Sequence, residues 1–141
     1  MLLSAALLCG GCFLDNASPT KRLADAVHEM NDSARWGRIG AASNFVDASY
    51  RHEFVQTHRR WGRTIKLADG EVLSVQFAED RESAEAIVTY SWYDLDTMTL
   101  HDTVVKQEWR ADDDFYGLSK ETVIEGDKRL LKMPDNKHAM R

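Results

Sequence analysis

The sequence predicts an α+β domain in which N-terminal helices pack on a curved antiparallel β-meander. In the first half of the chain, apolar residues recur every three or four positions, which is the period of an α-helix. From about residue 73, apolar and polar residues alternate, which is the period of a half-buried strand. Helices followed by consecutive strands are typical of an α+β fold and not of a βαβ fold.

Three helices are expected before residue 63. Ser18 and Pro19 begin the first, because serine accepts from free backbone N–H groups and proline fits the first helical position. A short second helix is predicted at residues 39–46. Asp47 caps the third, and Gly62 ends it. The inner face of the first helix consists of Leu23, Val27, Met30 and Ala34. The inner face of the third helix consists of Tyr50, Phe54, His58 and Trp61.

The second half of the chain predicts a meander of strands separated by charged turns. The turns are expected at residues 79–82, 94–97 and 112–114. Residues 65–67 add an edge strand before Gly70. The inward positions are Leu73, Val75 and Phe77, then Ala84, Ala86, Val88, Tyr90 and Trp92, then His101, Thr103, Val105, Gln107 and Trp109; the last strand runs from Phe115 to Ile124.

Composition narrows the function classes. The chain has 141 residues, 43% hydrophobic and 29% charged, which is ordinary for one globular domain. Its net charge of −5 argues against nucleic-acid binding, which needs a basic face. No metal site or cofactor is expected. His52 and His58 do not share a helix face, and residues 112–114 lack the glycine and distal glutamate of a calcium loop.

The first twelve residues form a short apolar segment that ends at two glycines and Cys12. Residues 2–8 are too few to cross a bilayer, which takes about 20, but they suit a signal peptide. With Cys12 directly after Gly11, the segment resembles the lipobox of bacterial lipoproteins. That resemblance implies cleavage before Cys12 and acylation of its thiol. The alternative, a redox or zinc pair with Cys9, lacks the second Cys/His pair or βαβ unit such motifs need.

The predicted organisation is a signal peptide at residues 1–12, one domain with a short tether at 13–126, and a basic C-terminal tail at 127–141. The lipid chains of Cys12 would attach the protein stably to a membrane of the bacterial envelope, facing the periplasm. Phe13 stands where inner-membrane lipoproteins of enteric bacteria carry aspartate. The resemblance therefore implies the outer membrane over the inner one.

The element order and the aromatic residues resemble the NTF2-like (cystatin-like) superfamily, and more narrowly uncharacterised bacterial lipoproteins of that fold. The resemblance rests on Arg35–Arg38 between two helices and on the strand segments Thr89–Tyr93 and Lys106–Arg110. It covers residues 18–123 and implies a cone with a pocket between the helices and the concave sheet face. It implies no reaction, because the superfamily includes isomerases, dehydratases, transport factors and non-catalytic modules.

Polar and aromatic residues on the inner face are the candidates for such a pocket. They are Tyr90, Trp92, His101, Gln107, Trp109 and His58. A histidine beside a tyrosine hydroxyl in an apolar pocket could move a proton. The alternative is that these residues, with Trp36 and Trp61, fill the core. Because Asp102 alternates outward, no acidic residue is expected on the inner face.

The sequence favours a non-enzymatic, lipid-anchored module that binds a small apolar ligand or an envelope protein. The alternative is a small-molecule isomerase or dehydratase that uses His101 and Tyr90 in an open cone. A third hypothesis is a structural module with a filled interior and an exposed apolar patch. Since relatives often dimerise through the sheet, a homodimer is expected through the outward residues Ile87, Thr89, Ser91 and Tyr93.

Overall fold

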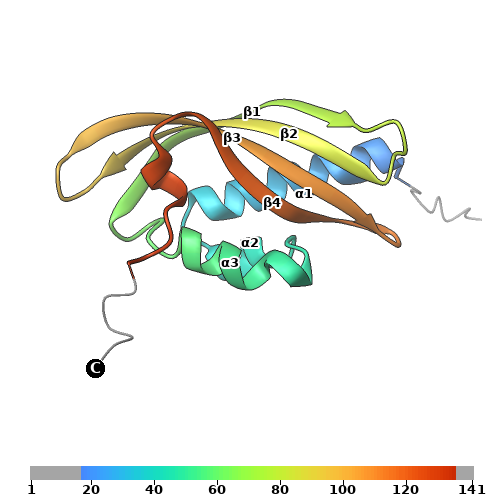
Figure 1. Ribbon diagram of the computed structural model, residues 1–141, viewed down its shortest axis with the longest axis horizontal. Coiled ribbons are helices and arrows are strands. Elements are labelled where there is room, and N and C mark those ends of the chain that lie inside the picture. The colour runs from blue at the N-terminus through green and yellow to red at the C-terminus, as the bar shows by residue number, and fades with distance from the viewer. Residues whose placement is uncertain (1–16, 136–141) are drawn as a thin grey trace, which may run out of the picture.

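The computed structural model describes residues 17–135, in which helices cover one face of a four-stranded sheet (Figure 1). The helices are α1 (Pro19–Arg35), α2 (Ile39–Ser43), α3 (Ala48–His58) and the 3₁₀ helix η1 (Lys128–Leu131). The strands are β1 (Ile65–Phe77), β2 (Ser83–Asp94), β3 (Thr99–Asp112) and β4 (Phe115–Gly126). Between residues 17 and 135, no helix is long and apolar enough to cross a membrane. The predicted α+β class is confirmed.

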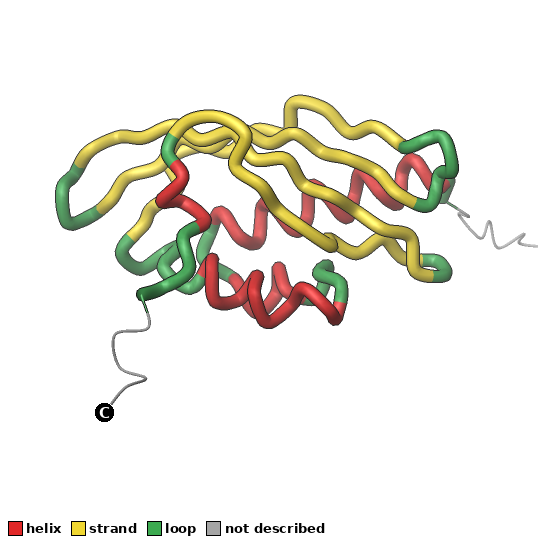
Figure 2. The backbone as a smooth tube through the Cα atoms, viewed as in Figure 1, coloured by secondary structure: helices red, strands yellow, loops and turns green. Residues whose placement is uncertain are grey.

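The sheet is an antiparallel meander in the order β1-β2-β3-β4 (Figure 2). In its two central strands, the alternation is the one expected. The inward residues of β2, from Ala84 to Trp92, are buried, while the outward residues between them stay partly exposed. The inward residues of β3, from Thr103 to Trp109, are buried in the same way. Because helices cover only one face, these side chains form the core.

Helix α1 follows the sequence pattern closely. The backbone N–H of Lys21 donates to the Ser18 hydroxyl at 3.2 Å, which supplies the predicted cap. Pro19 takes the first helical position. The helix buries its predicted face, Leu23, Val27, Met30 and Ala34.

Helix α3 connects to the sheet through a row of rings. Its cap is Asp47, whose carboxylate accepts from the Ser49 backbone N–H at 3.0 Å. The rings of Phe54 and His58 stack with centroids 4.0 Å apart. Trp61 lies beyond the helix end, 4.4 Å from His58 and 5.3 Å from Tyr90 between ring centroids. This row carries the predicted inner face of α3 across to β2.

Strand β1 differs from the prediction at its centre. The expected edge strand at residues 65–67 is continuous with the rest of β1 and passes through Gly70. A register shift between Val72 and Ser74 then inserts one unpaired residue. Leu73 is that inserted residue, and it is 54% exposed instead of facing the core, whereas Val75 and Phe77 pack against the core as predicted.

The fold continues past the predicted domain limit at residue 126. Leu130 in η1 is fully buried, and the Trp61 indole N–H donates to its carbonyl oxygen at 3.2 Å. Asp127 caps η1 by accepting from the Arg129 backbone N–H at 2.9 Å. The basic composition that suggested a tail surrounds this single buried leucine, so residues 127–131 belong to the domain.

Two loops cross at a pair of glycines. Gly37 follows α1 with a φ of +72°, and Gly62 follows α3 with a φ of +76°. A Cβ atom built on Gly62 would lie 2.9 Å from the Gly37 Cα, and one on Gly37 would lie 3.0 Å from the Gly62 Cα. The crossing is therefore backbone against backbone, in a conformation that favours glycine.

We expect Gly62→Ala to lower the free energy of unfolding by about 2 kcal/mol or more, because alanine is strained at this φ and its Cβ meets main chain. Gly40→Ala is the matched control. Gly40 lies inside α2, and a Cβ built on it would have no neighbour within 4 Å, so alanine should stabilise by about 0.5–1 kcal/mol. Urea unfolding measures both, and equal effects would contradict the backbone argument.

Candidate functional site

A network of polar side chains fills the interior between the helices and the sheet. The Tyr90 hydroxyl donates to the Asn31 amide oxygen. Asn31 and Gln107 exchange hydrogen bonds at 3.0 and 2.8 Å, and Gln107 also donates to a Glu121 carboxylate oxygen at 3.2 Å. These residues come from α1, β2, β3 and β4, so one buried network links four elements.

The network ends in a buried histidine–carboxylate pair. Nε2 of His58 lies 3.1 Å from Oε1 of Glu121, and each side chain is 1% exposed. Nδ1 of His58 lies 2.8 Å from the Phe54 carbonyl oxygen. The Thr57 hydroxyl oxygen also lies 2.9 Å from Nδ1, so this nitrogen has two polar neighbours on α3. The other ring nitrogen, Nε2, faces the carboxylate.

The expectation that no acidic residue faces the interior is wrong. Alternation counted from the buried Leu118 would turn Lys120 inward. A register shift between Glu108 and Trp109 leaves Ser119 as an extra residue, and this places Glu121 inward, opposite Gln107. The sequence does contain a sign of this insertion. Leu118 and Val123 are an odd number of positions apart, so these two apolar residues can share one face of β4 only if a residue is inserted between them.

The predicted pocket residues mostly form core. Trp61, Trp92 and Trp109 are buried, and the Trp92 indole N–H donates to the Thr103 hydroxyl at 3.0 Å. Trp36 is instead 60% exposed. Of the six candidates, Tyr90 lines a surface pocket of 260 Å³ and Trp109 one of 350 Å³. The structure therefore does not gather the six around one cavity.

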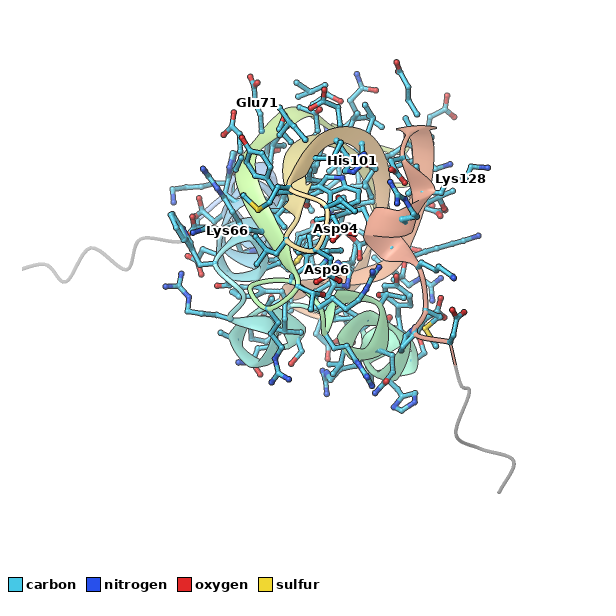
Figure 3. All side chains as sticks on the ribbon, turned by 90° about the vertical axis from the view of Figure 1, so that its left-hand side faces the viewer. Lys66, Glu71, Asp94, Asp96, His101 and Lys128 are labelled. Atoms are coloured by element: carbon cyan, nitrogen blue, oxygen red, sulfur yellow. The ribbon has the colours of Figure 1, made fainter. Side chains whose placement is uncertain are left out.

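His101 lies near the end of the sheet formed by the β2–β3 turn (Figure 3). Its ring stands 4.5 Å from the Trp92 ring between centroids, and its Nδ1 is 3.1 Å from an Asp127 carboxylate oxygen. The Arg129 side chain donates to Asp127 and thereby lowers the pKa of that carboxyl. The Tyr90 hydroxyl is bonded to Asn31 instead, so the structure does not form the His101–Tyr90 pair.

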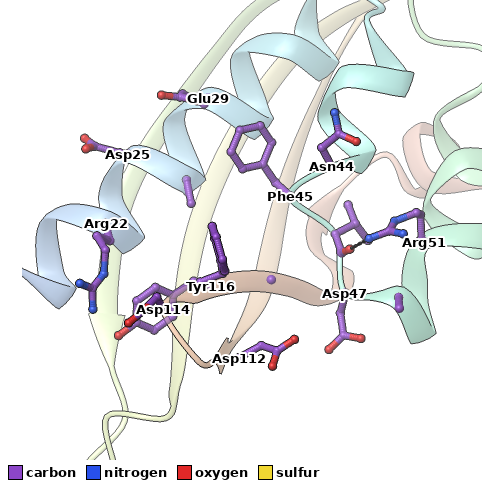
Figure 4. A pocket seen from close by; sticks show the side chains of 15 residues that line it. Arg22, Asp25, Glu29, Asn44, Phe45, Asp47, Arg51, Asp112, Asp114 and Tyr116 are labelled. Atoms are coloured by element: carbon purple, nitrogen blue, oxygen red, sulfur yellow. Dashed lines mark hydrogen bonds between the residues drawn. The ribbon is translucent and has the colours of Figure 1, made fainter. Parts of the chain in front are cut away.

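A different pocket, of 540 Å³, opens between α1, the α2–α3 junction and the β3–β4 hairpin (Figure 4). Its apolar part includes Phe45, Val46 and Tyr116. Its carboxylates are Asp25, Glu29, Asp47, Asp112 and Asp114, and its guanidiniums are Arg22 and Arg51. This pocket could not be predicted from the sequence, because its walls come from three separate segments.

Several charges of this pocket are already used by the fold. Asp25 pairs with Lys21 at 2.6 Å. The Ser49 backbone N–H donates to Asp47 and lowers the pKa of its carboxyl. Arg51 donates to the carbonyl oxygens of Ser43 and Val46 at 3.1 and 3.0 Å. Both guanidinium and carboxylate groups thus help to hold the pocket walls in place.

The outward residues of β2, from Ile87 to Tyr93, are half-buried on the sheet face that the helices leave uncovered. They alternate with the buried residues as expected. The structure holds one chain, so the homodimer through this face stays a prediction, which sedimentation of the full chain would decide.

Comparisons with known proteins support the fold. No protein-family model and no curated protein matches the chain. A solved structure from Nostoc punctiforme, a protein of unknown function with a cystatin-like fold, is 9% identical with a TM-score of 0.52, covering 82% of this chain and 93% of its own. The intermembrane space region of the chloroplast protein ARC6 is 12% identical with a TM-score of 0.47, covering 77% and 97%. The Nostoc likeness shows that this chain has a cystatin-like α+β fold.

We expect His58→Leu and Glu121→Leu each to lower the free energy of unfolding by about 3–5 kcal/mol, because each leaves its buried partner unpaired. The double variant should lose much less than the sum, because it removes both groups. Urea unfolding of the four proteins completes the cycle. Additive losses would show that the two side chains are not coupled.

Burial raises the pKa of the Tyr90 phenol, and the nearby Glu121 carboxylate raises it further. Above about pH 10 the unfolded chain releases this proton while the folded protein keeps it. The free energy of unfolding should therefore fall as pH rises above about 10. Tyr90→Phe should make that decline shallower, as measured by urea unfolding across this range. An unchanged decline would contradict the assignment.

Proposed function

We propose that this chain is a non-enzymatic module that binds a small ligand in the pocket between α1, the α2–α3 junction and the β3–β4 hairpin. The observation that supports it is the pocket itself. Its volume of 540 Å³ lies within the range of roughly 300–1,000 Å³ typical of small-molecule sites. Its lining combines apolar side chains such as Phe45 and Val46 with five carboxylates and two guanidiniums, and polar groups in such sites fix the orientation of a ligand.

The state of the interior argues against the isomerase or dehydratase hypothesis. A general acid or base must reach a substrate atom directly or through one water. His58 and Glu121 are enclosed, and neither of them lines the 540 Å³ pocket. His101 contacts Trp92, Asp127 and Arg129, and it is also absent from that pocket.

Native mass spectrometry of the protein purified without denaturant tests the binding role. We expect a small molecule to be retained, and Ala26→Trp should abolish its retention, because Ala26 lines the pocket and the indole would fill it. Thr20→Trp on the exposed side of α1 is the control and should retain the molecule. Equal retention by the two variants would place binding elsewhere.

The proposal includes attachment to a bacterial envelope membrane, preferably the outer one, through lipid on Cys12. Residues 1–12 lie outside the described part of the chain, so the support is the sequence pattern. The position of the pocket is compatible with it. Arg22, which lines the pocket, donates to the Ala17 carbonyl oxygen at 3.2 Å. The five residues after Cys12 span at most about 17 Å, so the pocket would open near the membrane surface.

Metabolic labelling with a palmitate analogue tests the attachment. We expect label in the wild-type protein and none in Cys12→Ser, because the thiol of Cys12 is the proposed acceptor. Cys9→Ser is the matched control and should keep the label, since Cys9 precedes the proposed cleavage point. Equal label in all three proteins would refute lipidation at Cys12.

A further inference from the structure

Residues 127–131, which include η1, form a strap that joins the end of the sheet to α3 (Figure 1). Gly126, the last residue of β4, has a φ of +83°, and the chain turns there toward the helix. Leu130 is fully buried and Leu131 packs partly against the core, while the two residues before them are exposed. The apolar attachment of the strap is therefore confined to its last two residues.

Two buried side chains of the domain donate to main-chain carbonyl groups of the strap. The Thr103 hydroxyl donates to the carbonyl oxygen of Asp127 at 2.8 Å. The Trp61 indole N–H donates to the carbonyl oxygen of Leu130 at 3.2 Å. Thr103 and Trp61 are at most 1% exposed, and a buried donor without an acceptor is costly. The domain therefore needs a segment with carbonyl groups at these two points.

Charged and titratable side chains of the domain complete the attachment. The Arg60 guanidinium donates to the carbonyl oxygen of Arg129. Nδ1 of His101 lies 3.1 Å from a carboxylate oxygen of Asp127. The surface that receives the strap, called the receiving surface below, thus consists of Arg60, Trp61, His101 and Thr103. It contacts three carbonyl groups and one carboxylate.

Most of these contacts do not depend on the sequence of the strap. Main-chain carbonyl groups are the same in every peptide, so bonds to them fix the course of a bound segment while side-chain contacts supply specificity. Only the leucine and the aspartate are recognised by their side chains. The receiving surface is therefore suited to any extended segment that carries these two residues at the same spacing.

The position of the strap allows its release. It belongs to no strand of the sheet, and the buried network that ends at His58 and Glu121 includes none of its residues. The order of its five residues opposes docking through lost conformational entropy. Segments with few buried apolar contacts open more readily than the core. Opening would thus uncover the receiving surface and leave the core intact.

We propose that the receiving surface binds an extended segment of a partner protein, and that the strap covers it until that segment displaces the strap. The partner's segment would carry a carboxylate residue three positions before a leucine, as Asp127 stands before Leu130. A second copy of this chain is a poorer occupant, because its strap already makes the same contacts in its own domain. Strap residues do not line the 540 Å³ pocket, so this interaction is separate from the proposed ligand site.

Peptide binding to full-length variants tests the proposal. The probe is fluorescein-labelled Gly-Asp-Lys-Arg-Leu-Leu-Lys-amide, the sequence of residues 126–132, and fluorescence anisotropy gives its dissociation constant. A covered surface lowers the apparent affinity by the fraction that is open, so Leu130→Ala should bind the probe at least about tenfold more tightly than the wild type. Met133→Ala, at an exposed position beyond the strap, is the control and should bind as the wild type does.

A second probe, with alanine in place of the first leucine, has the same charge. It should bind Leu130→Ala at least about tenfold more weakly than the first probe. Equal binding of the two probes would show general attraction of a basic peptide to this acidic chain and would overturn the proposal. So would absence of binding to Leu130→Ala, or equal binding by that variant and the wild type.

Hydrogen exchange of the wild-type chain tests release without a substitution. The Asp127 amide donates to the Asp102 carbonyl oxygen, and the Lys132 amide donates to that of Arg129. Both amides should exchange at least about tenfold faster than the bonded amides of β2 and β3, with little dependence on urea. Exchange only through global unfolding would overturn the proposal. A wild-type dimer in sedimentation that Leu130→Ala abolishes would assign the surface to a second copy's strap and contradict the partner assignment.

Discussion

The buried pairing of His58 with Glu121 is the constraint on which the rest of the interior depends. Removing a carboxylate from water costs several kcal/mol unless partners replace its hydration. Here the partners are the imidazole on α3 and the Gln107 amide on β3, and that amide is held in turn by Asn31 on α1. The helices and strands must therefore meet in one register for the imidazole and the carboxylate to face each other, which an apolar core alone would not require.

This arrangement bears on the position of the proposed binding site. Hydrogen-bonded amides, a phenol and the histidine–glutamate pair occupy the space between the helices and the sheet, where the resemblance to the NTF2-like superfamily implied a pocket. The 540 Å³ pocket lies instead at the side, against the first turns of α1 and the β3–β4 hairpin. The likeness in fold therefore does not by itself locate a binding site, and the fold alone does not fix the function.

Regular periodicity was enough to predict most of the architecture, and bulges limited the rest. The faces of α1, β2 and β3 followed from spacing because their alternation is unbroken. Leu73 was misplaced because it is itself the inserted residue of a bulge, and Glu121 because the insertion of Ser119 reverses the side chains that follow it. Only pairing with a neighbouring strand shows such insertions. The pocket could not be predicted for another reason. In the sequence, Asp112 and Asp114 indicate only a solvated turn, and the folded chain is needed to place α1 opposite them.

The crossing of Gly37 and Gly62 has a consequence for how this protein can evolve. In an ordinary core contact, a larger side chain is accommodated when its neighbour becomes smaller. Neither glycine has a side chain to give up, so compensation between the two is impossible. The crossing of the loops after α1 and α3 thus depends on contact between main-chain atoms. Homologues should keep both positions while the surrounding core side chains exchange volume freely.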